Sequence, residues 1–131
     1  MMPHITGVYA AVIGLLAVYL TINVIRFRLR FAVGAGDGGH PELLQAIRAH
    51  GNLTENAPLG LILIGSAEAL GANNNLIYVL GALLLIGRLA AAWGLGNSTG
   101  TSQGRQIGAA LTMIAMFVAS LTVLAKIASG Y

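Results

Sequence analysis

Cysteine is absent from this chain of 131 residues, which excludes a disulfide framework, a cysteine-ligated iron–sulfur cluster and a cysteine nucleophile. Charge is also scarce: only 8% of the residues are Asp, Glu, Lys or Arg, whereas a soluble domain carries about 25%. Hydrophobic residues make up 56%, and they are gathered in long runs. The chain lacks the polar surface of a soluble domain, so its composition predicts a protein that crosses a membrane several times.

Four apolar stretches fit the length of membrane-spanning helices. Crossing a hydrocarbon core of about 30 Å takes about 20 helical residues, so the chain has room for four crossings and short loops. We predict an all-α membrane protein in which residues 1–131 form one four-helix bundle. Its loops are the glycine-rich segment 33–41 and the polar segments 71–75 and 96–104. The predicted spans are approximately 5–25, 41–70, 76–95 and 105–128.

The small excess of positive charge, +3 at neutral pH, does not indicate a nucleic-acid partner, because the basic residues are scattered or stand beside apolar runs. Basic residues in such places orient a membrane protein, since the loops that carry them stay in the cytoplasm. Arg26, Arg28, Arg30 and Arg105 flank the first and third predicted loops, and the second loop has no basic residue. We therefore expect loops one and three in the cytoplasm and both termini outside.

The second span carries polar and charged residues where a membrane helix least easily accommodates them. In the run R-A-H-G-N-L-T-E-N-A-P, Asn52 lies about 40° from Arg48 around the helix, and Glu55 lies about 20° to the other side. Ionisable side chains within a membrane segment usually face the bundle interior or a water-filled cavity. This stripe predicts either a site for a polar ligand or a structural network that only holds helices together.

Arg88 stands within the third span between apolar neighbours. Counted from the second loop, it lies at a depth similar to that of Glu55 if the two helices are antiparallel, because each residue advances about 1.5 Å. We predict an ion pair between Arg88 and Glu55 within one subunit, with a purely architectural role as the favoured interpretation of Arg88.

Metal chemistry is not predicted. His40 and His50 have neither the spacing of metal ligands nor partner carboxylates on the same face. The glycines of residues 34–39 lack the Lys-Ser/Thr pair that would follow in a phosphate-binding loop, so they predict a flexible turn.

The run E-L-L-Q-A-I-R-A-H-G-N-L-T-E-N-A-P, residues 42–58, resembles the signature of the MAPEG family, the membrane-associated proteins in eicosanoid and glutathione metabolism. The preceding G-A-G-D-G-G and the later G-R-L-A-A-A-W-G-L, residues 87–95, are similar to its small bacterial branch. The resemblance covers nearly the whole chain. It implies a left-handed four-helix bundle, assembled as a homotrimer among the lipids of a bacterial inner membrane.

Members of this family bind glutathione in a cleft between neighbouring subunits near the cytoplasmic face, and enzymatic members activate its thiol as a thiolate. Carried over by the shared motif, the resemblance implies that five residues bind the tripeptide: Arg26, Arg48, Asn52, Glu55 and Arg105. Arg105 would also be the catalytic residue that stabilises the thiolate. Several guanidinium groups and one carboxylate suit a ligand with two carboxylates and one ammonium.

The sequence departs from the enzymatic members at three positions. Ala91 stands where they often carry a histidine, and Leu95 stands where they carry a tyrosine one turn later. Gln106 follows Arg105, where a serine or threonine is common in some of them. These differences weaken the expectation of catalysis more than the expectation of ligand binding.

The resemblance thus predicts a glutathione-binding membrane protein with transferase or peroxidase activity on lipophilic electrophiles from the bilayer. The alternative is a non-catalytic trimer that binds glutathione, another small anion or a lipid. A small four-helix drug exporter would have similar length and hydropathy, but proton-coupled exporters of that size need an accessible carboxylate, typically in the first span. The first predicted span has none, so this interpretation ranks last.

Overall fold

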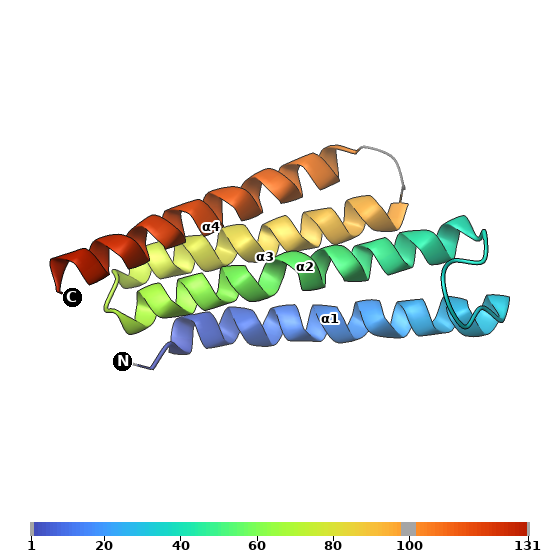
Figure 1. The fold of residues 1–131 in the computed structure, drawn as a ribbon, viewed down its shortest axis with the longest axis horizontal. Coiled ribbons are helices and arrows are strands. Elements are labelled where there is room, and N and C mark those ends of the chain that lie inside the picture. Colours follow the sequence, from blue (N-terminus) through green and yellow to red (C-terminus); the bar gives the residue numbers. More distant parts are fainter. Residues whose placement is uncertain (1, 98–101, 131) are drawn as a thin grey trace.

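Four long α-helices make up the computed structural model, which describes residues 2–97 and 102–130. In chain order they are α1 (His4–Phe31), α2 (Pro41–Ala69), α3 (Asn74–Asn97) and α4 (Gln103–Ser129). Each helix runs back alongside the preceding one, so the bundle is elongated (Figure 1). The α1–α2 loop lies at the end opposite the start of α1 and the end of α4. The prediction of an all-helical bundle is confirmed.

The helices are longer than most of the predicted spans. α1 continues through the basic residues that follow the first apolar run and ends at Phe31 rather than near residue 25. A helix satisfies its backbone hydrogen bonds internally, so nothing obliges it to stop where the hydrocarbon ends. α2 begins at Pro41, a residue whose missing N–H is not needed in the first turn. Residues 98–101 of the predicted third loop lie outside the described residues.

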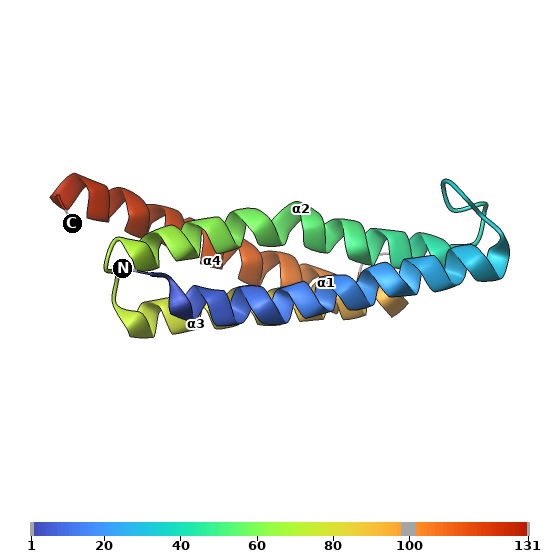
Figure 2. The same cartoon turned by 90° about the horizontal axis from the view of Figure 1, so that it is seen from below.

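α3 forms the centre of the packing. It lies against α4 along much of its length and also against α2, while α1 rests on α2 and on part of α3. Within the described ranges, the backbones of α1 and α4 do not pack against each other. Figure 2 shows α1 in front of α3 and α2 in front of α4.

Glycine brings helices into unusually close contact at two places. A Cβ atom on Gly108 of α4 would lie 2.5 Å from the carbonyl oxygen of Gly87 on α3, so the two backbones touch directly. A Cβ atom on Gly81 of α3 would collide with the ring of Tyr9, and the Tyr9 hydroxyl donates to the carbonyl of Tyr78 at 2.9 Å. Small residues at membrane helix contacts permit such approach.

Glu68, near the end of α2, fixes the start of α1. Its carboxylate accepts hydrogen bonds from the backbone N–H of Ile5 at 2.8 Å and of Thr6 at 2.7 Å, and from the Thr6 hydroxyl at 2.7 Å. The N-cap position, Pro3, provides no side-chain hydrogen bond. A carboxylate is well placed there because the first amides of a helix lack partners and carry partial positive charge. Glu68 is 1% exposed, so this contact is dry.

Three helices, α1, α3 and α4, are long and apolar enough to cross a membrane. α2 is not among them, and four Asp, Glu, Lys or Arg residues lie on it: Glu42, Arg48, Glu55 and Glu68. Large apolar side chains cover the outside of the bundle, and Leu15 and Phe117, for example, are 72% and 66% exposed. An apolar surface of this extent is suited to lipid rather than water.

Candidate functional site

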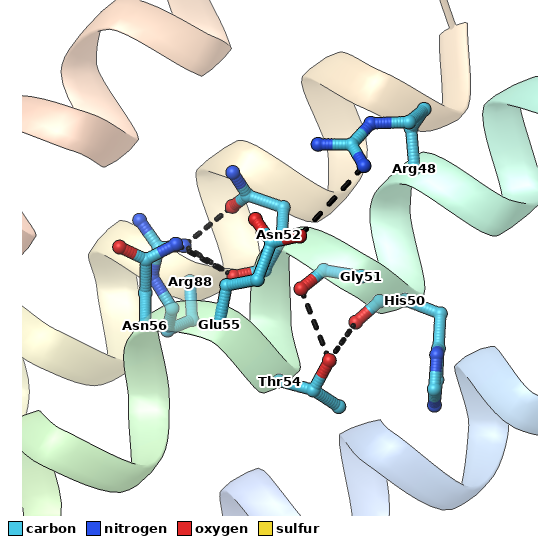
Figure 3. A network of polar contacts seen from close by, with 8 residues as sticks. All are labelled: Arg48, His50, Gly51, Asn52, Thr54, Glu55, Asn56 and Arg88. Carbon is cyan, nitrogen blue, oxygen red and sulfur yellow. Dashed lines mark hydrogen bonds and ion pairs between the residues drawn. The ribbon is translucent and has the colours of Figure 1, made fainter.

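Arg88 is the centre of the polar interior, and it joins three helices. Arg88 lies on α3 and is buried, with 2% of its surface exposed. Nε donates to the Thr112 hydroxyl at 2.9 Å, and Nη2 donates to the Gly108 carbonyl at 3.1 Å, both on α4. Nη1 donates to Asn52 on α2, to the backbone carbonyl at 3.3 Å and to the side-chain oxygen (Figure 3). Within the described part of the chain, every one of these acceptors is neutral.

The predicted ion pair between Arg88 and Glu55 is wrong for a single chain. The Glu55 carboxylate instead lies 3.7 Å from Nη1 of Arg48, seven residues earlier on the same helix. Both side chains are about half exposed, at 50% for Arg48 and 58% for Glu55. Gly51 lies beneath the pair and has no side chain to separate its members. Glu55 is thus directed away from α3, and Asn52, about 60° around the helix, takes the position facing Arg88.

The contact with Arg88 fixes how the Asn52 amide is oriented. A guanidinium group can only donate hydrogen bonds, so the atom of Asn52 that meets it must be the oxygen. The Asn52 backbone carbonyl is also engaged, because it accepts from Nδ2 of Asn56 at 2.8 Å. Because its oxygen meets Arg88, Asn52 would contact a ligand chiefly through its two amide N–H donors.

A cleft of about 250 Å³ opens beside Arg88, between α2, α3 and α4. Two of the residues lining it are arginines, Arg88 and Arg105, and the described lining contains no carboxylate. The remaining lining residues are Asn52, Ala91, Leu95, Ser102, Gln106 and Ala109. The cleft is therefore cationic, with hydrogen-bond donors from all three helices, and it suits an anion better than a cation or a purely apolar molecule.

Local structure at the start of α4 places Arg105 in this cleft. Ser102 is the N-cap residue, and its hydroxyl oxygen accepts from the backbone N–H of Arg105 at 3.3 Å. Gly94 and Gly104 bring this first turn close to α3, since a Cβ atom on Gly104 would lie 2.9 Å from the Ala90 carbonyl. The N-terminus of α4 adds partial positive charge to the arginine side chain. Helix geometry and side-chain charge therefore favour the same kind of ligand.

The other predicted site residues do not line this cleft. Arg48 and Glu55 form their own pair on the exposed face of α2. Arg26 lies on α1, where it lines a separate hollow of about 500 Å³ with Asn23 and Arg30. One chain therefore brings Asn52 and Arg105 together and leaves the remaining three outside. The part of the chain that the structure describes contains no group of three His, Cys, Asp or Glu residues that could hold a metal ion.

Three residues of the site were not predicted from the sequence: Thr112 and Gly108, which hold Arg88, and Ser102, which caps α4. A signal existed for two of them. Thr112 follows Arg105 by seven residues, so it lies within about 20° of it around the helix. Serine just before an apolar helical run is a common N-cap.

A membrane-type helical bundle with a buried arginine and a cationic cleft is the class of protein that the fold and site define. The sequence model of the MAPEG family matches residues 6–125, so the chain belongs to that family and the predicted resemblance is confirmed. The inner membrane protein YecN of Escherichia coli strain K12 is 37% identical over 90 residues, which are 69% of each chain. The protein of the same name from E. coli O6:H1 is similar to the same extent. With its three apolar helices, the chain is a membrane protein.

Proposed function

We propose that this protein binds glutathione in the cationic cleft between α2, α3 and α4, as a homotrimer in a bacterial inner membrane. One observation carries the proposal: Arg88 is buried at the wall of the cleft, and the partners described for it are all neutral. A buried charge without a countercharge is costly, and an anionic ligand would compensate it. Glutathione is a net anion with two carboxylates, and Arg105 and the Asn52 amide provide further donors for them.

The trimer explains why the five residues implied by the family motif are divided in one chain. Arg26 lines a separate hollow on α1, and the half-exposed Arg48–Glu55 pair lies on the outer face of α2. In a family whose ligand lies between subunits, α1 of one copy would complete the cleft of the next. α2 would cross the bilayer beside α1 and α3, with its charged face against a neighbouring copy rather than lipid. Both termini would then be outside and the first and third loops in the cytoplasm.

Catalysis is the less supported part of the proposal. Arg105 would lower the pKa of the bound thiol by placing positive charge beside the thiolate, and the Ser102 hydroxyl would be a second donor. The product would be a conjugate of glutathione with a lipophilic electrophile, or a reduced hydroperoxide.

A non-catalytic binding protein is the second candidate, and a specific observation favours it. Ala91 and Leu95 are each 3% exposed and line the cleft with apolar surface, at the positions where enzymatic relatives carry polar groups. In that case the protein would hold glutathione or another small anion without activating it.

Titration calorimetry of the purified protein with glutathione and with S-hexylglutathione tests the binding. Arg105→Ala should weaken both ligands at least tenfold, since a hydrogen bond to a charged group contributes about 1.5–3 kcal/mol. Lys126→Ala is the matched control: it removes one positive charge from the other end of α4 and should leave the affinity unchanged. Absence of any binding overturns the proposal.

Thiolate absorbance and conjugation of an aryl chloride then distinguish the two candidates. A thiolate signal that disappears in Arg105→Ala establishes the enzyme. Binding without that signal establishes the non-catalytic protein.

A further inference from the structure

A second and larger cavity lies on the other face of α3. It is a groove of about 500 Å³ between α1, α2 and α3, within the range of about 300–1,000 Å³ that is typical of ligand pockets. Much of its wall is apolar, formed by Leu16 and Leu20 of α1, Ala49 of α2 and Leu89 and Ala92 of α3. Among the described lining residues, none is shared with the cationic cleft. The two cavities are therefore distinct, although α2 and α3 contribute to both.

The packing of α1 explains where this groove opens. Near the start of α1, the Tyr9 ring lies against Gly81 and closes the space between α1 and α3. Farther along, α2 presents the small side chains of Ala46 and Ala49, which leave room between the flanking helices. The groove is thus open over the half of α1 that leads toward the α1–α2 loop.

The end of the groove nearest that loop is polar and carries charges of both signs. Glu42 and Gln45, in the first turns of α2, line it together with Asn23 of α1. The neighbouring hollow, which holds Arg26 and Arg30, shares Asn23 and Phe27 with the groove, so the two are continuous. Toward the loop, the apolar part of the groove thus leads to the Glu42 carboxylate on one side and to the guanidinium groups of Arg26 and Arg30 on the other.

We propose that this groove holds one glycerophospholipid of the bilayer whose head carries a phosphate and a primary ammonium. The ammonium pairs with Glu42, the phosphate with Arg30, and one acyl chain lies along Leu16, Leu20 and Ala49. Charge complementarity selects this occupant. The Glu42 carboxylate would repel a head group that is only anionic, and the two arginines would repel one that is only cationic. The inference does not depend on glutathione binding, because the groove and the cleft share no described lining residue.

Trp93 gives a direct readout. It is the single tryptophan of the chain, it lines the groove, and it is 70% exposed. The full chain is reconstituted in phosphatidylcholine nanodiscs with increasing mole fractions of brominated phosphatidylethanolamine or brominated phosphatidylglycerol, and quenching of Trp93 fluorescence is measured. Phosphatidylethanolamine should reach half-maximal quenching at a mole fraction about two- to fivefold lower, the preference expected of a hydrated ion pair.

Two pairs of variants identify the groove as the source of that preference. Glu42→Gln should abolish it, whereas Asp37→Asn, which removes a carboxylate from the adjacent loop, should retain it. Ala92→Phe, which fills the groove from α3, should raise the half-maximal mole fraction of both lipids. Ala82→Phe, at a half-buried position of α3 outside the groove, should not.

Several results would overturn the proposal. Equal quenching by the two brominated lipids means that Trp93 meets only bulk bilayer. A preference that survives Glu42→Gln refutes the assigned head-group contact. If neither lipid quenches Trp93, a second copy of the chain covers the groove. Should Ala92→Phe fail to fold, the exposed and nearly isosteric Glu42→Gln exchange still decides the question.

Discussion

Removing the hydroxyl of Thr112 is the sharpest test of the Arg88 network. Thr112→Val keeps the shape of the side chain but deletes the acceptor that lies 2.9 Å from Arg88 Nε. Thr112 and Arg88 are each 2% exposed, so water does not readily replace the lost partner. A buried donor left without an acceptor costs about 1–3 kcal/mol, and more when the donor is charged. We expect Thr112→Val to destabilise the folded bundle by about 2–3 kcal/mol.

A double-mutant cycle separates this cost from ordinary packing effects. In Arg88→Met the guanidinium is absent, so the valine at position 112 should then cost little or nothing. The coupling between the two positions should therefore reach about 2–3 kcal/mol, the upper part of the range for residues in one network. Arg88→Met paired with Glu55→Gln should instead be additive within about 0.5 kcal/mol, because the structure shows no contact between these side chains.

Unfolding of the purified protein in mixed micelles, followed by the loss of helical circular dichroism with added denaturing detergent, measures each free energy. The matched exchange Thr122→Val removes a hydroxyl whose hydrogen bond stays within α4, to the Val118 carbonyl at 2.8 Å, and it should cost far less. Strong coupling of Arg88 with Glu55, together with no coupling to Thr112, would refute the assigned network.

Three further outcomes follow from the packing and the surface. Glu68→Gln should destabilise the bundle by about 1–3 kcal/mol and speed amide hydrogen exchange in the first turn of α1, because a neutral amide accepts more weakly than a carboxylate; unchanged exchange there would contradict the capping role. Gly108→Ala should cost at least about 1–3 kcal/mol in detergent unfolding, whereas Gly14→Ala, whose Cβ meets nothing within 4 Å, should be neutral or stabilising. Exchanging Arg48 and Glu55 for Gln should each change the stability of the detergent-solubilised monomer by less than about 1 kcal/mol, since the pair is half exposed; a larger loss measured at high salt would exclude this interpretation.

The fold followed from hydropathy with few errors, since apolar run length and polar breaks define membrane helices well. The ends of the helices were harder to predict. Hydropathy reports where hydrocarbon would begin, but helical hydrogen bonding continues beyond that point, as α1 does through Arg26, Arg28 and Arg30 to Phe31. The charges on α2 also could not be assigned a direction from composition, because their orientation depends on how the helix is rotated against α3.

The site shows the same limit at the level of single residues. Depth along two antiparallel helices correctly placed Arg88 opposite the polar stripe of α2. Depth does not determine which member of the stripe faces across, and a rotation of about 60° exchanges Glu55 for Asn52. The identity of that partner matters, because a carboxylate would have neutralised the arginine, while an amide leaves its charge available. Asn52 and Arg105 were predicted as site residues by the family motif, and the structure brings both to one cleft.

The direct backbone contact between Gly87 and Gly108 has a consequence for selectivity. Most binding sites adjust to a ligand by small side-chain rotations, so their dimensions can change. Here the two main chains are in contact one residue before Arg88 and Ala109, which line the cleft, and main chains do not rotate out of the way. The spacing between α3 and α4 is therefore fixed at this point. The preferred ligand could change only through the side chains that line the cleft, such as Ala91 and Leu95.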